Sequence, residues 1–224
     1  MSKTALVTGA ASGLGLAISD ALSADGYQVH RVDKEFGHDV RSPETMHVPD
    51  RLDVLVNAAG VNRINWLADV SDEEWDHVME TNVKGIFKMT QACLPALKAT
   101  GGTVLNIVSN AAHMPMRCSA AYNASKGAAL ILTKQLAREL SADGVTVFSV
   151  SPNKLAGTGM SRAIDEQVVA TRGWTMEEAQ RYQLTSLLTG EETPVHLCAE
   201  FIGYLLSTKE RHRFLTGCDI PYGA

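Results

Sequence analysis

The sequence has little of what marks a nucleic-acid-binding or membrane-spanning protein. Its formal net charge is -5, so no basic excess favours nucleic acid or an anionic membrane surface. No apolar run approaches the ~20 residues that cross a bilayer. The first residues lead directly into a strand-like segment, which leaves no room for a signal peptide. We therefore expect a cytoplasmic protein without membrane or nucleic-acid partners.

Cysteine is scarce as well. The 4 cysteines form no C-x-x-C pair, and no Cys/His group has the spacing of a zinc site. We therefore expect free thiols in a reducing compartment and no metal centre. The cysteines are Cys93, Cys118, Cys198 and Cys218.

Apolar strand-like runs alternate with helical patterns along the whole chain, which has no repeat, low-complexity tract or linker. The patterns predict strands at 5–7, 27–32, 54–56, 104–108, 145–150 and 214–220. They predict helices at 14–24, 73–97, 120–140, 176–182 and 195–206. Such alternation is typical of a parallel sheet covered on both faces. The sequence therefore predicts a single α/β domain over residues 1–224, a Rossmann-type doubly wound sheet that binds its ligand beyond the carboxyl ends of the strands.

A glycine-rich segment follows the first predicted strand. Gly9, Gly13 and Gly15 permit a tight turn and a close approach of backbone to a ligand. The helix that begins there offers free N–H groups and the positive end of its dipole to a pyrophosphate. We predict that this loop, with Ser12 and Leu14, binds a dinucleotide, although a loop of this kind also fits an ordinary strand-to-helix connection.

Asp33 ends the second predicted strand. A carboxylate at this place accepts hydrogen bonds from ribose hydroxyls and repels a 2′-phosphate, which favours NAD over NADP. Arg31 and Lys34 stand beside it and would partly neutralise a phosphate. NADP therefore stays open as the less favoured cofactor.

Four further motifs, together with the glycine loop, resemble those of the short-chain dehydrogenase/reductase family. The glycine loop matches the family pattern T-G-x-x-x-G-x-G, and the N-A-A-G run at 57–60 resembles its N-N-A-G motif. A Y-x-x-x-K motif, a serine thirteen residues before its tyrosine, and a helix asparagine complete the set in the family's order. The matching residues are Thr8, Gly9, Gly13, Gly15, Asn57, Ala58, Ala59, Gly60, Asn82, Ser109, Tyr122 and Lys126.

Tyr122 and Lys126 are four residues apart on a predicted helix, so they share a face. A nearby ammonium lowers the pKa of a phenol from about 10 toward the working pH. Tyr122 would then act as general acid in reduction and as general base in oxidation. Ser109, at a strand end, would bond the substrate oxygen as negative charge develops on it. Taken alone, each of these residues also fits a structural role.

The resemblance implies further roles. Lys126 and Tyr122 would contact the cofactor ribose, and the run at 57–60 would line the cofactor. Asn82 would distort its helix and hold a water that relays protons from Lys126. The resemblance also implies a homotetramer or homodimer that assembles through the helices at 73–99 and 120–142.

The chain departs from the family pattern after the second strand. Only 19 residues separate Asp33 from Asp53, and they include one glycine and two prolines. A parallel crossover needs about a dozen residues or more, usually with a helix. We therefore predict that the helix after the second strand is missing and that the sheet edge near 38–40 is reduced. Asp39 and Val40 still resemble the family's acidic–apolar pair near the adenine.

A second departure follows the sixth family strand, where Pro-Gly is common. Here Pro152 precedes Asn153, and Thr158, the threonine expected to meet the carboxamide, is displaced by one residue. Asn tolerates unusual backbone conformations, so the loop can still close around the cofactor.

Residues 159–192 occupy the place of the family's variable substrate lid. The leading hypothesis is an NAD-dependent oxidoreductase that acts on a small-molecule alcohol or ketone. The alternative is a cofactor-binding regulatory or scaffold protein with little turnover. Reduction of ketones on an acyl carrier is disfavoured by Asp33 and by the acidic net charge. Candidate pocket residues are Asn62, Arg63, Trp66, Asn110, His113, Met114, Met116, Arg117, Met160, Trp174, Met176 and Tyr182.

Overall fold

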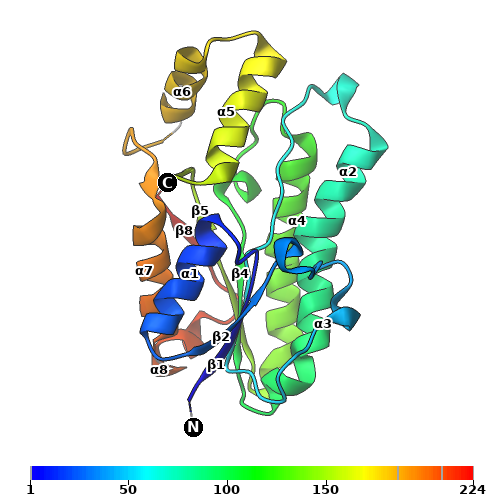
Figure 1. The fold of residues 1–224 in the computed structure, drawn as a ribbon, viewed down its shortest axis with the longest axis vertical. Helices are drawn as coiled ribbons and strands as arrows, with labels where there is room; N and C mark the ends of the chain where they lie inside the picture. Colours follow the sequence, from blue (N-terminus) through cyan, green and yellow to red (C-terminus); the bar gives the residue numbers. More distant parts are fainter. Residues whose placement is uncertain (1, 186, 208, 224) are drawn as a thin grey trace.

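The computed structural model describes residues 2–185, 187–207 and 209–223. Among these residues, six parallel strands form a central sheet in the order β2-β1-β3-β4-β5-β8 (Figure 1). The chain moves outward from β1 to β2, returns to β3, and then moves in the other direction, as in a doubly wound sheet. The strands are β1 (Thr4–Thr8), β2 (Gln28–Val32), β3 (Val54–Asn57), β4 (Thr103–Ile107), β5 (Thr146–Pro152) and β8 (Asp219–Tyr222).

Helices cover both faces of the sheet, as the strand pattern predicted. Helices α1 (Gly13–Ala24) and α7 (Val195–Leu206) pack together on one face (Figure 1). The other face carries α3 (Gly85–Lys98) and α4 (Ala120–Leu140), with α2 (Asp72–Met79) leading into α3. Every residue of β3 and β5 is buried, because strands covered on two faces have no solvent side. The prediction of a single doubly wound α/β domain is confirmed.

The connection between β2 and β3 is short, as predicted. It contains two single 3₁₀ turns, Lys34–Phe36 and Pro43–Thr45, in place of a crossover helix, and β2 is left at the edge of the sheet. Gly37 ends the first turn with a left-handed φ of 82°, and a proline begins the second. Val40 and Leu52 from this connection are buried in the core beside α3. The short connection therefore still fills the space under the sheet edge.

The predicted helix at 73–97 is interrupted, since α2 and α3 are joined through a π-helical segment, Glu80–Lys84. A capping box between Ser71 and Glu74 begins α2. The predicted strand at 214–220 is partly wrong. Residues Arg213–Leu215 form a 3₁₀ turn, and Gly217 has a φ of 78°, so extended backbone begins only at Asp219.

The region after β5 contains more structure than the sequence predicted. Helix α5 (Gly159–Arg172) precedes α6 (Met176–Thr185), and a two-stranded sheet pairs β6 (Leu155–Ala156) with β7 (Thr193–Pro194). Helix α8 (Lys209–His212) follows α7. Helices α5 and α6 lie beyond the carboxyl ends of the central strands (Figure 1).

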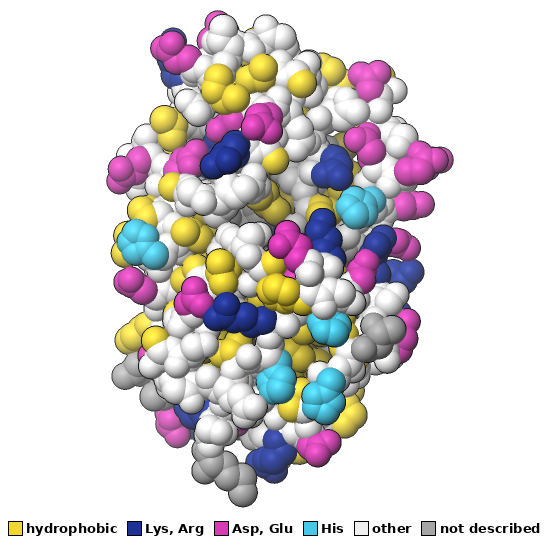
Figure 2. Space-filling model, viewed as in Figure 1, with side chains coloured by type: hydrophobic (Ala, Val, Ile, Leu, Met, Phe, Trp, Pro, Cys, Tyr) yellow, Lys and Arg dark blue, Asp and Glu magenta, His cyan; other side chains and the backbone are white. Residues whose placement is uncertain are grey.

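On the face shown in Figure 2, acidic and basic side chains are interspersed, so no single sign of charge dominates it. Within the described ranges, no helix combines the length and the apolar character needed to cross a membrane.

Candidate active site

The glycine loop between β1 and α1 is pressed against neighbouring backbone. A Cβ on Gly15 would lie 2.2 Å from the carbonyl oxygen of Gly9, and a Cβ on Gly9 would lie 2.9 Å from the Cα of Ala59. The Thr8 hydroxyl accepts hydrogen bonds from the backbone N–H groups of Ala58 (3.0 Å) and Ala59 (3.1 Å). The loop and the 57–60 run therefore form one rigid edge at the carboxyl ends of β1 and β3.

Two other members of the loop have local roles. Ser12 holds the N-cap position of α1 in extended backbone, and Leu14 packs on the core on the α1 side of the sheet. Gly13 has a φ of 55°, in the left-handed region that favours glycine. The loop thus keeps the backbone close to the start of α1, where N–H groups converge.

Asp33 follows β2 directly and reaches the glycine loop. Its carboxylate accepts hydrogen bonds from the backbone N–H groups of Ala11 (3.1 Å) and Glu35 (3.1 Å). The nearby Arg31 guanidinium pairs with Asp20 at 2.5 Å. Asp33 is therefore tied to the glycine loop, a contact that the sequence did not predict.

Asp39 and Val40 differ in their surroundings. The Asp39 carboxylate pairs with Arg41 at 2.6 Å, and this hydrogen-bonded pair lowers the carboxyl pKa below its usual value. Arg41 also approaches Glu80 at 3.6 Å. Val40 is buried against α3, where a Cβ on Gly85 would lie 2.8 Å from the Val40 Cγ2. Asp39 is thus at the surface, whereas the Val40 side chain belongs to the core.

Asn57 turns its side chain into the interior. Its Nδ2 donates to the Asn106 Oδ1 (2.9 Å) and to the Thr90 hydroxyl (3.4 Å). Its Oδ1 is buried and has no partner among the described residues. Any contact of Asn57 with a cofactor would therefore come from its backbone.

Four candidate catalytic residues converge near the ends of β3 and β4. Asn82, Lys126 and Tyr122 are 0%, 5% and 7% exposed. Ser109 follows β4, and its side chain interacts with the Tyr122 phenol. A Cβ on Gly60 would lie 3.4 Å from the Asn82 Oδ1 and 3.7 Å from the Lys126 Nζ. The helix asparagine and the helix lysine thus meet beside the 57–60 run.

Asn82 lies in the π-helical segment, and hydrogen bonds to Val61 and Ser125 fix its side chain. Its Oδ1 accepts from the Val61 N–H (2.8 Å), and its Nδ2 donates to the Val61 carbonyl (2.9 Å) and to the Ser125 hydroxyl (3.0 Å). Ser125 in turn donates to the Tyr122 carbonyl at 2.8 Å. Ser125 was not predicted as a site residue, although it lies within the Y-x-x-x-K motif.

The protonation of the cluster is governed by burial. Desolvation lowers the pKa of Lys126 to about 8, and its Nζ donates to the Ile107 carbonyl at 3.0 Å. Desolvation raises the pKa of Tyr122, and the hydrogen bond with Ser109 acts in the opposite direction. The Lys126 Nζ lies 5.7 Å from the centre of the Tyr122 ring. The phenol pKa is therefore raised by burial, and not lowered as the sequence predicted.

The loop after β5 closes toward the glycine loop. Asn153 holds it to the end of β8, since its N–H donates to the Tyr222 carbonyl (2.9 Å). Thr158 caps α5 by accepting from the Ser161 N–H (3.1 Å), and its Cβ lies 3.8 Å from the place of a Cβ on Gly13. Pro152 is buried at the end of β5. Thr158 therefore borders the glycine loop despite its displaced position in the sequence.

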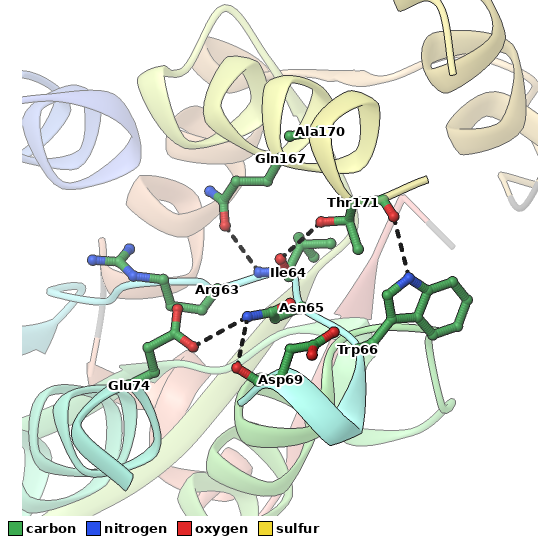
Figure 3. Close-up of a pocket in the computed structure, with 9 residues that line it drawn as sticks. All are labelled: Arg63, Ile64, Asn65, Trp66, Asp69, Glu74, Gln167, Ala170 and Thr171. Atoms are coloured by element: carbon green, nitrogen blue, oxygen red, sulfur yellow. Dashed lines mark hydrogen bonds between the residues drawn. The ribbon is translucent and has the colours of Figure 1, made fainter. Parts of the chain in front are cut away.

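Helix α5 is tied to the segment after β3 around a cavity of about 600 Å³ (Figure 3). The Ile64 N–H donates to the Gln167 Oε1 (2.9 Å), and the Thr171 hydroxyl donates to the Ile64 carbonyl (3.2 Å). The Trp66 indole donates to the Thr171 carbonyl at 3.1 Å. Arg63 and Trp66, both predicted pocket residues, line this cavity. Its remaining lining residues are Ile64, Asn65, Asp69, Glu74, Gln167, Ala170 and Thr171.

Trp174 and Tyr182, also predicted for the pocket, pack against each other instead. Their rings meet edge to face with centroids 5.2 Å apart, and the Arg172 guanidinium lies 4.6 Å and 4.5 Å from them. Lys154 anchors the base of α5 through ion pairs with Asp165 (2.5 Å) and Glu192 (2.9 Å). Among the described residues, no group of three or more His, Cys, Asp or Glu side chains is placed to hold a metal.

A doubly wound sheet with a glycine loop after its first strand defines the class of α/β dinucleotide-binding folds. Residues 40–169 match the family model described as short chain dehydrogenase. The 3-oxoacyl-(acyl-carrier-protein) reductase FabG of Staphylococcus epidermidis is 30% identical over 250 residues, which cover 98% of this chain and 97% of the relative. The chain belongs to the short-chain dehydrogenase/reductase family of oxidoreductases.

Solved structures agree in fold and extent. A variant actinorhodin polyketide ketoreductase with NADPH has a TM-score of 0.85 at 29% identity, covering 98% of this chain and 95% of the other. A 2-deoxy-d-gluconate 3-dehydrogenase, described as putative, from Agrobacterium tumefaciens with bound NADP has a TM-score of 0.83 at 27% identity, covering 98% and 94%. The FabG alignment is longer than the 224 residues of this chain, so that relative carries segments without a counterpart here.

Proposed function

We propose that the protein is a nicotinamide-dependent oxidoreductase that interconverts a small-molecule alcohol and ketone, with Tyr122 as the general acid/base. The observation that carries the proposal is the buried cluster in which Lys126 and Asn82 meet beside Gly60 while Tyr122 interacts with Ser109. Lys126, Asn82 and Ser109 are each held by a separate hydrogen bond to backbone or to Ser125, so these three side chains are positioned in advance of the reaction.

The glycine loop fits a dinucleotide. The space beside Gly9 and Gly15 is too small for a Cβ, so the loop makes a tight turn that packs against its own backbone and the 57–60 run, as in loops that precede a pyrophosphate-binding helix N-terminus. Ser12, Gly13 and Leu14 would hold the pyrophosphate, and Asp33 the adenosine ribose. Asp39 and Val40 would border the adenine. The 57–60 run, Pro152 and Thr158 would line the nicotinamide half.

When bound, the nicotinamide cofactor supplies or accepts the hydride. Tyr122 donates a proton to the carbonyl oxygen in reduction and accepts it in oxidation. Ser109 donates a hydrogen bond to the same oxygen as charge develops on it. Lys126, with a pKa of about 8, changes its charge near neutral pH and favours ionisation of Tyr122 when it is protonated. Asn82 holds Val61 and Ser125, and so fixes the space that a relaying water would occupy.

We propose that Asp33 directs a preference for NAD(H). A 2′-phosphate on the ribose would meet the Asp33 carboxylate, while Arg31 and Arg41 are each paired with an acidic side chain. The two solved relatives are described with NADPH and NADP, which favours the phosphorylated cofactor. The proposal for NAD(H) therefore rests on the charge at position 33.

The region 159–192 is proposed as the substrate lid, because α5 contacts the segment after β3 beside the catalytic cluster. We also propose self-association as a homotetramer or homodimer through α3 and α4. An apolar groove of about 420 Å³ there is bordered by Met79, Val83, Phe87 and Leu132, with Glu80 and Lys84 at its rim. Burying such a groove against a twofold mate removes apolar surface from water.

The test is turnover with a panel of ketones and alcohols, measured with NADH and with NADPH. The proposal expects turnover by the natural chain and a loss of at least 10²-fold in Tyr122→Phe, with both rates measured at saturating cofactor. Cofactor binding without turnover on any carbonyl would favour the alternative of a binding protein. The names of the relatives make a 3-oxoacyl thioester one member of the panel.

A further inference from the structure

Residues 109–114 follow β4 and form a short loop, the Ser109 loop. A buried carboxylate lies on the side of the sheet next to this loop. Asp219 on β8 is 7% exposed in its side chain. Its Oδ1 accepts from the hydroxyls of Ser149 (2.5 Å) and Ser151 (2.8 Å), and its Oδ2 accepts from Ser151 (2.9 Å). These serines stand two residues apart on β5, so they present their hydroxyls on one face of the sheet. The remaining bond to Asp219 comes from His113.

His113 is the member of this network that belongs to the Ser109 loop. Its Nε2 lies 2.8 Å from the Asp219 Oδ2, so the geometry assigns a proton to Nε2. Ser109 and His113 are the residues that flank the 3₁₀ turn Asn110–Ala112, at its start and its end. His113 was predicted as a pocket residue, but its Nε2 is bonded to Asp219 of β8.

Among the described residues, hydrogen bonds from outside reach the Ser109 loop from two directions. A single 3₁₀ turn has little stability of its own. From the α4 side, the Asn123 amide donates to the carbonyls of Ala111 (2.6 Å) and Met114 (2.8 Å). From the sheet side, the hydrogen bond between His113 and Asp219 holds the part of the loop that follows Ser109. The loop is therefore held between α4 and β8.

We propose that His113 and Asp219 are positioning residues that set the hydroxyl of Ser109 for the reaction. This rests on the proposed function, in which Ser109 contacts the substrate oxygen. The Ser149 and Ser151 hydroxyls hold the carboxylate in place, and the carboxylate holds His113. Loss of the hydrogen bond between His113 and Asp219 would allow the loop to move. A displacement of about 1 Å at a reacting group lowers the rate by up to 10²-fold.

The kinetic test compares His113→Ala with His113→Gln, whose amide N–H takes the place of the Nε2 donor. His113 is 40% exposed in its side chain, so both variants are expected to fold. We expect His113→Ala to lower kcat about tenfold without changing the Kd of the cofactor, and His113→Gln to restore most of the loss. His196→Ala, an exposed histidine on α7, is the matched control and keeps the natural rate.

A double-mutant cycle separates positioning from a general structural effect. If His113 acts through Ser109, then His113→Ala costs nothing further in a Ser109→Ala background. The same tenfold loss in both backgrounds would overturn the proposal, as would a His113→Gln variant as slow as His113→Ala.

Hydrogen exchange tests the same idea without turnover. The amides of Ala112, His113 and Met114 bond within the loop. We expect their exchange to accelerate at least tenfold in His113→Ala and to stay unchanged in His196→Ala. If the natural chain reduces no carbonyl, the proposed function fails and exchange alone decides the positioning role. Unchanged exchange in His113→Ala would overturn that role.

Discussion

Substitution of Gly15 by alanine is the sharpest structural test of the glycine loop. The added Cβ would lie 2.2 Å from the Gly9 oxygen, 2.7 Å from the Gly9 carbonyl carbon and 3.0 Å from the Thr8 oxygen. All three atoms are backbone, so no side chain can rotate away, and the loop itself must shift. Overpacking of this kind costs about 1–3 kcal/mol. At about 2 kcal/mol, a domain of this size loses about 4–8 °C in Tm.

Gly127→Ala is the matched control. Gly127 lies within α4, and a Cβ there meets nothing within 4 Å. Alanine at a helix interior is expected to stabilise by about 0.5–1 kcal/mol. Thermal unfolding and NADH titration are measured on both variants. We expect Gly15→Ala to unfold earlier and to bind NADH at least tenfold more weakly, while Gly127→Ala gains stability and keeps its affinity. An unchanged Tm and affinity in Gly15→Ala would refute the close approach.

Three further predictions concern cofactor choice, proton linkage and assembly. Asp33→Ala is expected to lower the ratio of NADH to NADPH affinity at least tenfold in fluorescence titrations; an unchanged ratio would remove Asp33 from the selection of cofactor. Because burial lowers the pKa of Lys126 from 10.5 to about 8, the unfolded chain binds more protons between these values, so this lysine makes the free energy of unfolding rise with pH there. Denaturant titrations at several pH values give the unfolding free energy of the natural chain minus that of Lys126→Met. This difference should increase between about pH 8 and 10.5, by up to about 1.4 kcal/mol per pH unit. A difference that does not change with pH would contradict the lowered pKa of Lys126. Phe87→Asp should lower the molar mass in light scattering, because it places a charge in the apolar groove on α3 and α4, whereas a natural chain that is already monomeric would contradict the assembly.

The elements marked by glycine and proline were predictable from the sequence. The glycine loop, the short connection after β2 and the left-handed turn at Gly144, shortly after α4, all depend on backbone conformations that these residues favour or exclude. The catalytic motifs could be placed at strand ends and on one helix face, because their spacing is local. The structure brings the predicted cluster of Ser109, Tyr122, Lys126 and Asn82 together.

Helix α5 was not predicted, because its buried face is partly polar. Ser161 and Asp165 are buried there, and Asp165 is compensated by Lys154, which lies outside the helix. A periodicity of apolar residues cannot reveal such a face. The final strand was placed too early because Phe214 and Leu215 have strand-like character, whereas the φ of 78° at Gly217 breaks the extended run.

Long-range polar contacts were out of reach of the sequence. The bond between His113 and Asp219 joins residues 106 positions apart, and that between Asn57 and Asn106 joins residues 49 apart. Both arise because parallel strands place distant residues in register, as Asn57 with Asn106 and Ser149 with Asp219. No local pattern encodes these pairs, so the direction of the Asn57 side chain and the anchor of the Ser109 loop became apparent only in the folded chain.

The most direct test of the account is transfer of deuterium from 4,4-dideuterated NADH or NADPH to a carbonyl substrate, followed by mass spectrometry of the product. The account predicts one deuterium on the former carbonyl carbon with the natural chain. It predicts a rate at least 10²-fold lower in Tyr122→Phe when both proteins are saturated with cofactor. Labelled product formed equally fast by Tyr122→Phe would contradict the role of Tyr122 as general acid.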